Sequence, residues 1–420
     1  MATLSSIPLS GFVAPGFEPV RDLFAKHFAD GRELGAGYFA SVDGVVVVDL
    51  AGGWANRART KPFSGDTVTV VYSCGKAVQG MTVAHLVSRG LLEYDAPVAK
   101  YWPEFAAGGK EHVTVRDLCQ HAAGVPYLDD ANLVSPRDHL SGDVAGVAAK
   151  LARQSHSHGG KKTKVYHATT QGWYLNEIIR RVTGGLTHGQ LLRQLVNPAL
   201  GIDVFAGFDV TDPRMEERYA EIVPSEKFMK ALAASPPKKG SLKLLVARSG
   251  PPRTEANDPE IRKSEIPSAF TVTNARSLGK LATLASMGGS LDGFTFIDEK
   301  TLRDSCAVDP EMDGVVDLFT DLPTRTCRGG ASWSNSLPGY KVPTVVPRDR
   351  PEWKGDGWSW TGWMGTGGSH FQWDLTNRVA SAYVMNLIEP GWDERGMELA
   401  ASLVECVEKA RAKNVTKGRL

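Results

Sequence analysis

Ser73 and Lys76 are the residues of this sequence whose types and spacing point most directly to a chemical reaction. They follow a short apolar, strand-like run, residues 70–72, and precede apolar residues that recur at helical spacing. In a helix that begins near Ser73, positions i and i+3 share a face, so the hydroxyl and the amine lie side by side. The helix N-terminus also leaves N–H groups unpaired near the serine oxygen. An adjacent amine with a lowered pKa can take the serine proton and make the hydroxyl a nucleophile.

The Ser-x-x-Lys spacing occurs three times, so it is not specific by itself. Two prolines follow Ser235 and disfavour the helix that would align it with Lys238. Ser277 and Lys280 lie inside a helical pattern with no strand before it. Only Ser73 has the strand-to-helix setting, and even there a helix-capping serine with a surface lysine would explain the pair equally well.

Composition sets the class of protein. The chain has 420 residues, a net charge of +1 and 42% hydrophobic residues, which predicts a globular protein of two or three domains or one large discontinuous one. It has no basic block, so nucleic acid is not expected as a partner. No run approaches the roughly 18 apolar residues of a membrane span, and the first residues lack the features of a secretory signal.

The five cysteines are scattered, odd in number and never spaced Cys-x-x-Cys. This favours reduced thiols, a cytoplasmic location and no metal site. The histidines of residues 155–160 fit a solvated loop better than a metal tract. The final residues 417–420 faintly resemble a peroxisomal signal, from which Gly418 departs. The sequence carries no signal for an oligomeric state.

Hydrophobic periodicity predicts strands near both ends of the chain and helices between them. Residues 38–42 and 45–50 flank Asp43-Gly44, a strong hairpin signal, and residues 371–374 and 379–385 form a second pair. Helices are expected at residues 20–27, 144–151, 172–182, 189–196, 274–285 and 397–407. We therefore expect an α+β fold: one antiparallel sheet built from both termini and flanked by helices, in a discontinuous α/β domain of residues 1–75 and 286–420. A mainly helical domain of residues 76–285 would be inserted into it.

Two further polar stretches are candidates for the site. Tyr166-His167-Ala168 stands just before a helix, where a tyrosine is usually a half-buried packing residue. The Gly-rich residues 362–369 precede the closing hairpin, and five of the ten tryptophans (353, 358, 360, 363 and 373) lie nearby. A bulged edge strand would explain these glycines, and so would a backbone N–H aimed at a substrate carbonyl.

These segments, taken in order, resemble the serine β-lactamase and penicillin-binding-protein family, whose signature opens with Ser-x-x-Lys. Residues 113–124, Val-Thr-Val-Arg-Asp-Leu-Cys-Gln-His-Ala-Ala-Gly, look like its T-V-R-D-L-L-x-H-x-S-G turn. Residues 90–98 look like its G-x-L-x-L-D-D-P-V segment. The resemblance runs from about residue 15 to about residue 410 and is strongest to the class C-like branch, which includes carboxylesterases and acyltransferases.

The resemblance implies roles for particular residues. Ser73 would be the acylated nucleophile, Lys76 would help to deprotonate it, and Tyr166 would act as general base and acid. The backbone N–H groups of Ser73 and Thr366 would form the oxyanion hole. Trp363, Met364 and Gly365 would contact the substrate where antibiotic-processing members carry Lys-Thr-Gly, and His370 would reach it from just beyond. The partner would be a small acyl substrate, and the mechanism requires no cofactor.

Two departures from the family pattern bear on specificity. Tyr-x-Asn has become Tyr166-His167-Ala168, and Lys-Thr-Gly has become Trp363-Met364-Gly365, which removes an amide and a cation. Both changes favour neutral esters of short or medium acyl chains over penicillins and peptides. The hypotheses are therefore a serine hydrolase of carboxylesterase type, an acyltransferase, a β-lactamase or peptidase, and a non-catalytic binding module. The sequence nowhere contains Gly-x-Ser-x-Gly, so an α/β-hydrolase site is unsupported.

Overall fold

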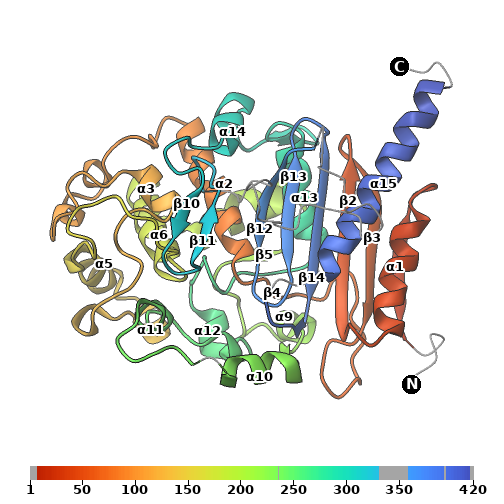
Figure 1. The fold of residues 1–420 in the computed structure, drawn as a ribbon, viewed down its shortest axis with the longest axis horizontal. Helices are drawn as coiled ribbons and strands as arrows, with labels where there is room; N and C mark the ends of the chain where they lie inside the picture. The colour runs from red at the N-terminus through yellow and green to blue at the C-terminus, as the bar shows by residue number, and fades with distance from the viewer. Residues whose placement is uncertain (1–6, 235, 331–357, 392–393, 417–420) are drawn as a thin grey trace.

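The computed structural model describes residues 7–234, 236–330, 358–391 and 394–416. A six-stranded antiparallel sheet, ordered β1-β3-β2-β14-β13-β12, is built from strands of both ends of the chain (Figure 1). Its strands are β1 (Leu9–Val13), β2 (Gly35–Val42), β3 (Val45–Gly53), β12 (Trp360–Met364), β13 (His370–Asp374) and β14 (Val379–Met385). The central pair joins β2 to β14, with Tyr38 opposite Tyr383. The expected α+β class and the sheet made from both termini are confirmed.

The turn between β2 and β3 is the one that Asp43-Gly44 predicts. Asp43 has a φ of 50° and Gly44 a φ of 80°, so both central residues are left-handed, as a two-residue hairpin turn requires. The turn fixes the register that places Tyr38 opposite Leu50. The second expected pair is β13 with β14, joined after Asp374.

Helices cover the two faces of the sheet. On one face, α1 (Glu18–Ala29) packs beside α15 (Arg395–Thr416) (Figure 1). On the other face lies α13 (Ala275–Ser286), where Gly279 leaves room for the Phe39 ring and Thr283 Oγ1 lies 2.7 Å from Ser41 Oγ. Because strand side chains alternate, Phe39 and Ser41 point to α13 while Tyr38 points to α15.

The position of α13 corrects one expected boundary. This helix falls inside residues 76–285, the range expected for the inserted helical part, yet it packs on the sheet. Its apolar side meets β2, β13 and β14, which explains why a helix so late in the insert belongs to the sheet. The inserted part therefore returns to the sheet before Ala275. The division of the chain into two domains otherwise stays a prediction.

The remaining elements form the mainly helical part and its connections. The helices of four or more residues are α2 (Cys74–Ser88), η3 (Pro103–Ala106), α3 (Val115–Cys119), α4 (Pro136–Leu140), α5 (Val144–Arg153), α6 (Thr170–Val182), α7 (His188–Leu191), η5 (Leu192–Val196), α8 (Asn197–Leu200), α9 (Pro213–Arg218), α10 (Glu226–Ala234), α11 (Leu242–Arg248), α12 (Pro259–Lys263) and α14 (Glu299–Cys306). Short 3-10 turns are η2 (Val98–Lys100), η4 (Asp130–Asn132) and η6 (Arg253–Glu255).

Small sheets tie the helical part to the rest of the chain. β4 (Thr69–Val70), β5 (Val204–Phe205) and β7 (Val272–Thr273) form one of them, and β6 (Val223–Pro224) pairs in parallel with β15 (Leu387–Ile388). Two hairpins complete the elements, β8 (Ser290–Leu291) with β9 (Phe294–Thr295), and β10 (Val315–Asp317) with β11 (Leu322–Thr324). One large hydrophobic core includes residues from Phe17 to Val407 and extends through both parts, so they pack as one body.

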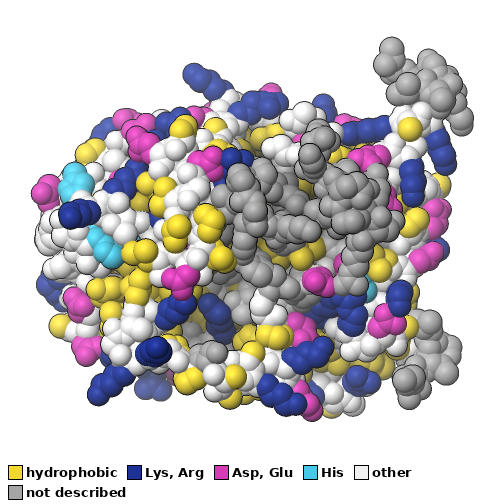
Figure 2. Space-filling view, in the orientation of Figure 1, with side chains coloured by type: hydrophobic (Ala, Val, Ile, Leu, Met, Phe, Trp, Pro, Cys, Tyr) yellow, Lys and Arg dark blue, Asp and Glu magenta, His cyan; other side chains and the backbone are white. Residues whose placement is uncertain are grey.

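The surface agrees with the near-neutral composition. On the face shown in Figure 2, Lys and Arg side chains are interspersed with Asp and Glu. Over the described ranges, no helix is both long and apolar enough to cross a bilayer. All five cysteines are unpaired thiols, as their scattered positions predicted.

A buried ion pair fastens α15 to the sheet and gives a stability prediction. Arg395 Nη1 lies 2.7 Å from Glu33 Oε2, both side chains are almost fully buried, and the guanidinium also donates to the Gly367 carbonyl. Arg395→Met leaves the Glu33 charge buried without its cation, so we expect a loss of about 3–5 kcal/mol in the free energy of unfolding. Arg303→Met, which breaks an exposed pair with Glu299, should cost less than about 1 kcal/mol. Chemical denaturation of both variants measures the difference, and equal losses would contradict it.

Candidate active site

Ser73 lies where β4 ends and α2 begins, as the sequence predicted. The preceding residue, Tyr72, is buried and has a φ of 47°, a left-handed conformation that is uncommon for any residue but glycine. This turn redirects the chain so that Ser73 becomes the N-cap of α2, with its side chain partly exposed. Strained backbone of this kind persists where the surrounding packing holds it, and it often occurs at functional sites.

Lys76 is buried and touches no carboxylate in the described part of the chain. Its Nζ donates to the carbonyl oxygens of Ala168 and Ser268 at 2.7 and 2.6 Å, and it lies 3.3 Å from Ser73 Oγ. Burial disfavours the ammonium form, and the positive charge of Arg253 adds to the effect. The pKa of Lys76 is therefore well below the usual 10.5.

Tyr166 is the third member of the cluster. Its hydroxyl lies 2.8 Å from Ser73 Oγ, and Lys76 Nζ stands 4.8 Å from the centre of its ring. Burial raises the pKa of Tyr166 to about 12, although the hydrogen bond to Ser73 acts in the opposite direction. The structure thus brings together the three side chains that the sequence singled out, two from one helical turn and one from the segment before α6.

His121 fixes the position of Tyr166, and the sequence analysis missed this role. The His121 carbonyl accepts the N–H of Val165 at 3.0 Å, and its Nδ1 accepts the N–H of His167 at 3.2 Å. These two bonds hold the backbone on both sides of Tyr166, whose ring also packs against the imidazole. The left-handed backbone of His121, with a φ of 64°, makes both contacts possible, and only the folded chain displays it.

The Gly-rich turn after β12 approaches the backbone before Ser73. A Cβ on Gly365 would lie 2.2 Å from the Val71 carbonyl oxygen, so only glycine fits there. Ser369 Oγ donates to the same carbonyl at 2.9 Å. Among the described residues, the backbone N–H groups of Ser73 and Thr366 form no hydrogen bond. An oxyanion hole needs two backbone donors of this kind, so these N–H groups stay the candidates for it.

The three other expected substrate contacts divide between the two faces of the sheet. Trp363 lies at the site, with its ring stacked on that of Tyr166 at 6.2 Å. Met364 is its neighbour on β12, so its side chain belongs to the opposite face. His370 pairs with Met364 across the hairpin and is enclosed by Tyr38, Tyr383 and α15.

The prediction that His370 reaches the substrate is therefore wrong. Its ring is 2% exposed and lies 3.3 Å from Ser381 Oγ, on the far side of the sheet from Ser73. Burial there lowers the pKa of His370 to about 3, which keeps the ring neutral. Trp353 lies outside the described residues, as do residues 417–420.

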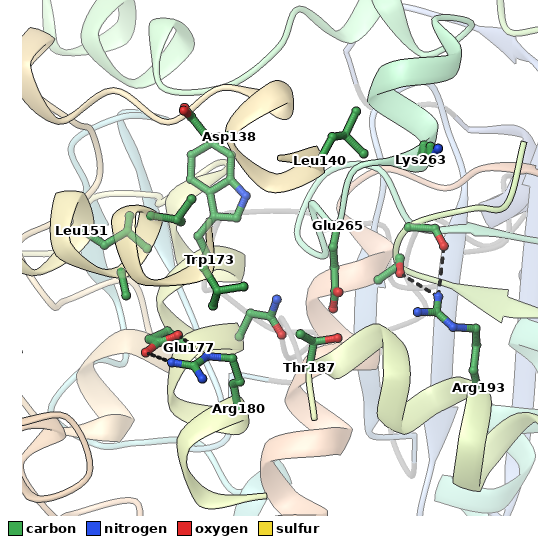
Figure 3. A pocket seen from close by; sticks show the side chains of 16 residues that line it. Asp138, Leu140, Leu151, Trp173, Glu177, Arg180, Thr187, Arg193, Lys263 and Glu265 are labelled. Carbon is green, nitrogen blue, oxygen red and sulfur yellow. Dashed lines mark hydrogen bonds and ion pairs between the residues drawn. The ribbon is translucent and has the colours of Figure 1, made fainter. Parts of the chain in front are cut away.

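A separate pocket lies within the helical part (Figure 3). It has a volume of about 220 Å³ and is lined by side chains of α4, α5, α6 and the segment around Glu265. Three of its charged groups are bound within the chain: Arg180 makes two bonds to Glu177, Arg193 donates to the Gly207 carbonyl, and Glu265 accepts the N–H of Gly189. None of the Ser73 cluster lines it, so we assign it no part in the chemistry.

The fold and the site together define a class of enzyme. An antiparallel sheet flanked by helices carries a serine at the start of a buried helix, a lysine one turn later and a tyrosine from an inserted segment. This is the arrangement of enzymes that use Ser-x-x-Lys to form a covalent acyl intermediate.

Comparison with known proteins identifies the family. The Beta-lactamase family model matches residues 20–404, so the chain belongs to the Beta-lactamase family. It is 30% identical over 348 residues to the esterase/beta-lactamase LipL of Mycobacterium tuberculosis, which covers 79% of this chain and 76% of LipL. The resemblance drawn from the sequence motifs is confirmed.

Two solved structures are similar over nearly the whole chain. A family VIII carboxylesterase is 30% identical, with a TM-score of 0.78, covering 95% of this chain and 100% of that one. A penicillin-binding protein homolog from Caulobacter crescentus is also 30% identical, with a TM-score of 0.74 and the same coverage. The expectation of a serine hydrolase is confirmed with the family.

The position of His121 leads to a kinetic prediction. His121→Asn keeps a residue that tolerates the left-handed backbone but shortens the side chain that accepts the N–H of His167. We expect kcat for ester hydrolysis to fall about 10- to 100-fold as Tyr166 shifts from Ser73. His370→Asn, an equally buried substitution on the other face, is the matched control and should lower the melting temperature without changing kcat. Equal effects of the two substitutions on kcat would contradict the role of His121.

Proposed function

We propose that this protein is a carboxylesterase that forms a covalent acyl-enzyme on Ser73 and acts on esters of short or medium acyl chains. The observation that carries the proposal is that Ser73 Oγ lies within hydrogen-bonding distance of both the Tyr166 hydroxyl and Lys76 Nζ. The Lys76 amine has no carboxylate partner in the described chain. The family VIII carboxylesterase and LipL, an esterase/beta-lactamase by name, support the assignment.

The pKa directions assign the proton transfers. With its pKa raised to about 12, Tyr166 is protonated near neutral pH, whereas the lowered pKa of Lys76 makes the free amine accessible. We therefore assign Lys76 as the group that finally holds the serine proton, and Tyr166 as the hydroxyl that passes it on. This differs from the role expected from the family resemblance, in which Tyr166 is the base.

The reaction then proceeds in two halves. Ser73 Oγ attacks the ester carbonyl, and its proton passes to Lys76. The N–H groups of Ser73 and Thr366 hold the oxyanion until the intermediate collapses. The C–O bond to the alcohol breaks and the alcohol leaves with that proton. Water next attacks the acyl-Ser73 ester, loses a proton by the same route, and releases the free acid and the serine.

The apolar neighbourhood of Ser73 supports esters over β-lactams. Trp363 stands where the antibiotic-processing members carry a lysine, and its ring stacks on Tyr166. Phe319 lies on the same tyrosine, with ring centres 5.9 Å apart. These rings offer an acyl chain apolar contact and offer a β-lactam carboxylate no cation at that position. A cytoplasmic location, based on the unpaired cysteines, stays a prediction.

Covalent labelling tests the nucleophile. Incubation with a fluorophosphonate probe should add one phosphonyl group to Ser73, seen by peptide mass spectrometry, and Ser73→Ala should remain unlabelled. Ser277→Ala is the matched control, because Ser277 has the same Ser-x-x-Lys spacing but lies within the first turn of α13, where its N–H donates to the capping residue Asn274. Labelling that survives in Ser73→Ala, or a protein that reacts with neither phosphonates nor esters, would refute the proposal and favour a non-catalytic binding module.

The pH dependence tests the assignment of the base. Because the reactive form of Lys76 is the neutral amine, kcat/KM should rise as pH increases through the Lys76 pKa and level off well below pH 10.5. Lys76→Arg cannot lose its proton and should lower kcat about 10²- to 10⁴-fold. Tyr166→Phe should slow the reaction and keep the same acid limb. If the acid limb of the kcat/KM profile shifts to a different pH in Tyr166→Phe, Tyr166 is the base instead.

A further inference from the structure

The segment that joins α11 to α12 forms a wall beside the Ser73 cluster. Ser249 is buried, and its Oγ accepts the N–H of Leu128 at 2.9 Å. Gly250 abuts Thr169, where a Cβ would lie 2.4 Å from the threonine hydroxyl. Thr169 follows Ala168, whose carbonyl binds Lys76. The segment is thus packed directly against the backbone that holds the catalytic lysine.

Two buried phenols fix the main chain around Arg253. The Tyr72 hydroxyl donates to the Arg253 carbonyl at 2.9 Å, and the Tyr219 hydroxyl donates to the Ala256 carbonyl at 2.8 Å. Tyr72 is the residue immediately before Ser73, so a single hydrogen bond ties the Arg253 main chain to the side chain of the residue next to the nucleophile. The backbone at Arg253 is therefore rigid, although its side chain is exposed.

Arg253 differs from the two nearest arginines, Arg248 and Arg262, in having no acidic partner among the described residues. Arg248 pairs with Asp130, and Arg262 makes two bonds to Glu216. Within the described residues, the Arg253 guanidinium makes neither an ion pair nor a side-chain hydrogen bond. An arginine that is held in place by its backbone and left unpaired is available to bind an anion.

The charge of Arg253 reaches the groups that perform the chemistry. Burial lowers the pKa of Lys76 and raises the pKa values of Tyr166 and Tyr72, and the positive charge of Arg253 acts to lower all three. Asp317 acts on Tyr166 in the opposite direction, but its carboxylate accepts the N–H groups of Phe319 and Thr320. The field over Ser73 is therefore positive on the Arg253 side.

We propose that Arg253 is a substrate-binding residue that receives a free carboxylate, so that the preferred esters carry a second, anionic group. This inference rests on the proposed function and narrows its substrate class. Trp363 occupies the position at which the family pattern has a lysine. In this chain Arg253, from the inserted part, would supply the positive charge instead. Its planar guanidinium can bind both carboxylate oxygens, which a neutral ester cannot offer.

Two pairs of matched esters test the inference and show where the carboxylate belongs. For the acyl side, the mono-4-nitrophenyl ester of adipic acid is compared with its methyl-capped diester. For the alcohol side, 4-carboxyphenyl butanoate is compared with 4-(methoxycarbonyl)phenyl butanoate. The quantity measured is the ratio of kcat/KM for the anionic ester to that for the neutral ester. Intrinsic differences in reactivity cancel when the ratio of a variant is divided by that of the wild type.

We expect Arg253→Ala to lower this ratio by about tenfold for one of the two pairs, mainly through KM. Arg253→Lys should restore part of it, and added salt should weaken the wild-type preference. Lys239→Ala removes the same charge from an exposed position between α10 and α11 and should leave the ratio unchanged. A ratio that Arg253→Ala does not alter for either pair would overturn the inference.

The outcome separates this inference from the proposed function. Neutral esters that remain substrates while the ratio is unchanged would refute only the carboxylate site. A protein that hydrolyses no ester of either kind would refute the proposed function itself. A shift of the acid limb in Arg253→Ala without a change in the ratio would show that Arg253 tunes Lys76 and does not touch substrate, which also overturns the inference.

Discussion

The burial of one amine organises the site. Lys76 is buried and has no carboxylate partner in the described chain. Its amine instead contacts two backbone carbonyls and the Ser73 hydroxyl. A buried lysine in this condition gives up its proton readily, because the charged form is the one that burial penalises. The carbonyls come from Ala168 and Ser268, so the same contacts that tune the amine also join α2 to two distant segments.

The second requirement is a backbone that cannot relax. Tyr72 holds a left-handed turn just before the serine, and Gly365 approaches the Val71 carbonyl too closely for any side chain. The turn at Tyr72 positions the Ser73 nucleophile, and the close approach of Gly365 positions the backbone next to Thr366. A regular strand would place neither group there. Strain of this kind costs of order 1–3 kcal/mol at a residue, which a core shared by both parts of the chain can support.

The sequence predicts those features of the site and the fold that depend on residues within a single helix or turn. Ser73 and Lys76 were found because three residues make nearly one helical turn, and Asp43-Gly44 because two left-handed residues close a hairpin. Tyr166 was reached only through the family resemblance, since nothing nearby distinguishes it from a packing tyrosine. The α+β class followed from strands at the two ends of the chain.

The parts that sequence did not reveal depend on register or on main-chain contacts. His370 was misplaced because its face of the sheet is fixed by pairing with Met364, opposite to the face that Trp363 uses. His121 acts through a carbonyl and a ring nitrogen that bracket Tyr166, a geometry with no residue pattern. Nothing in the sequence distinguishes Arg253 from the other arginines, and its lack of an ion pair among the described residues is visible only once its neighbours are placed.

The pairing of β2 with β14 has a consequence for how the molecule forms. Strands from opposite ends of the chain meet at the centre of one sheet, so this pairing joins residues far apart in the sequence, and topologies with such long-range pairing fold slowly. During synthesis, β2 and β3 emerge long before their central neighbour exists, and their apolar face and open edge stay uncovered until the last strands arrive. The nascent chain should therefore depend on chaperones, and catalytic competence should appear all at once near the end of translation.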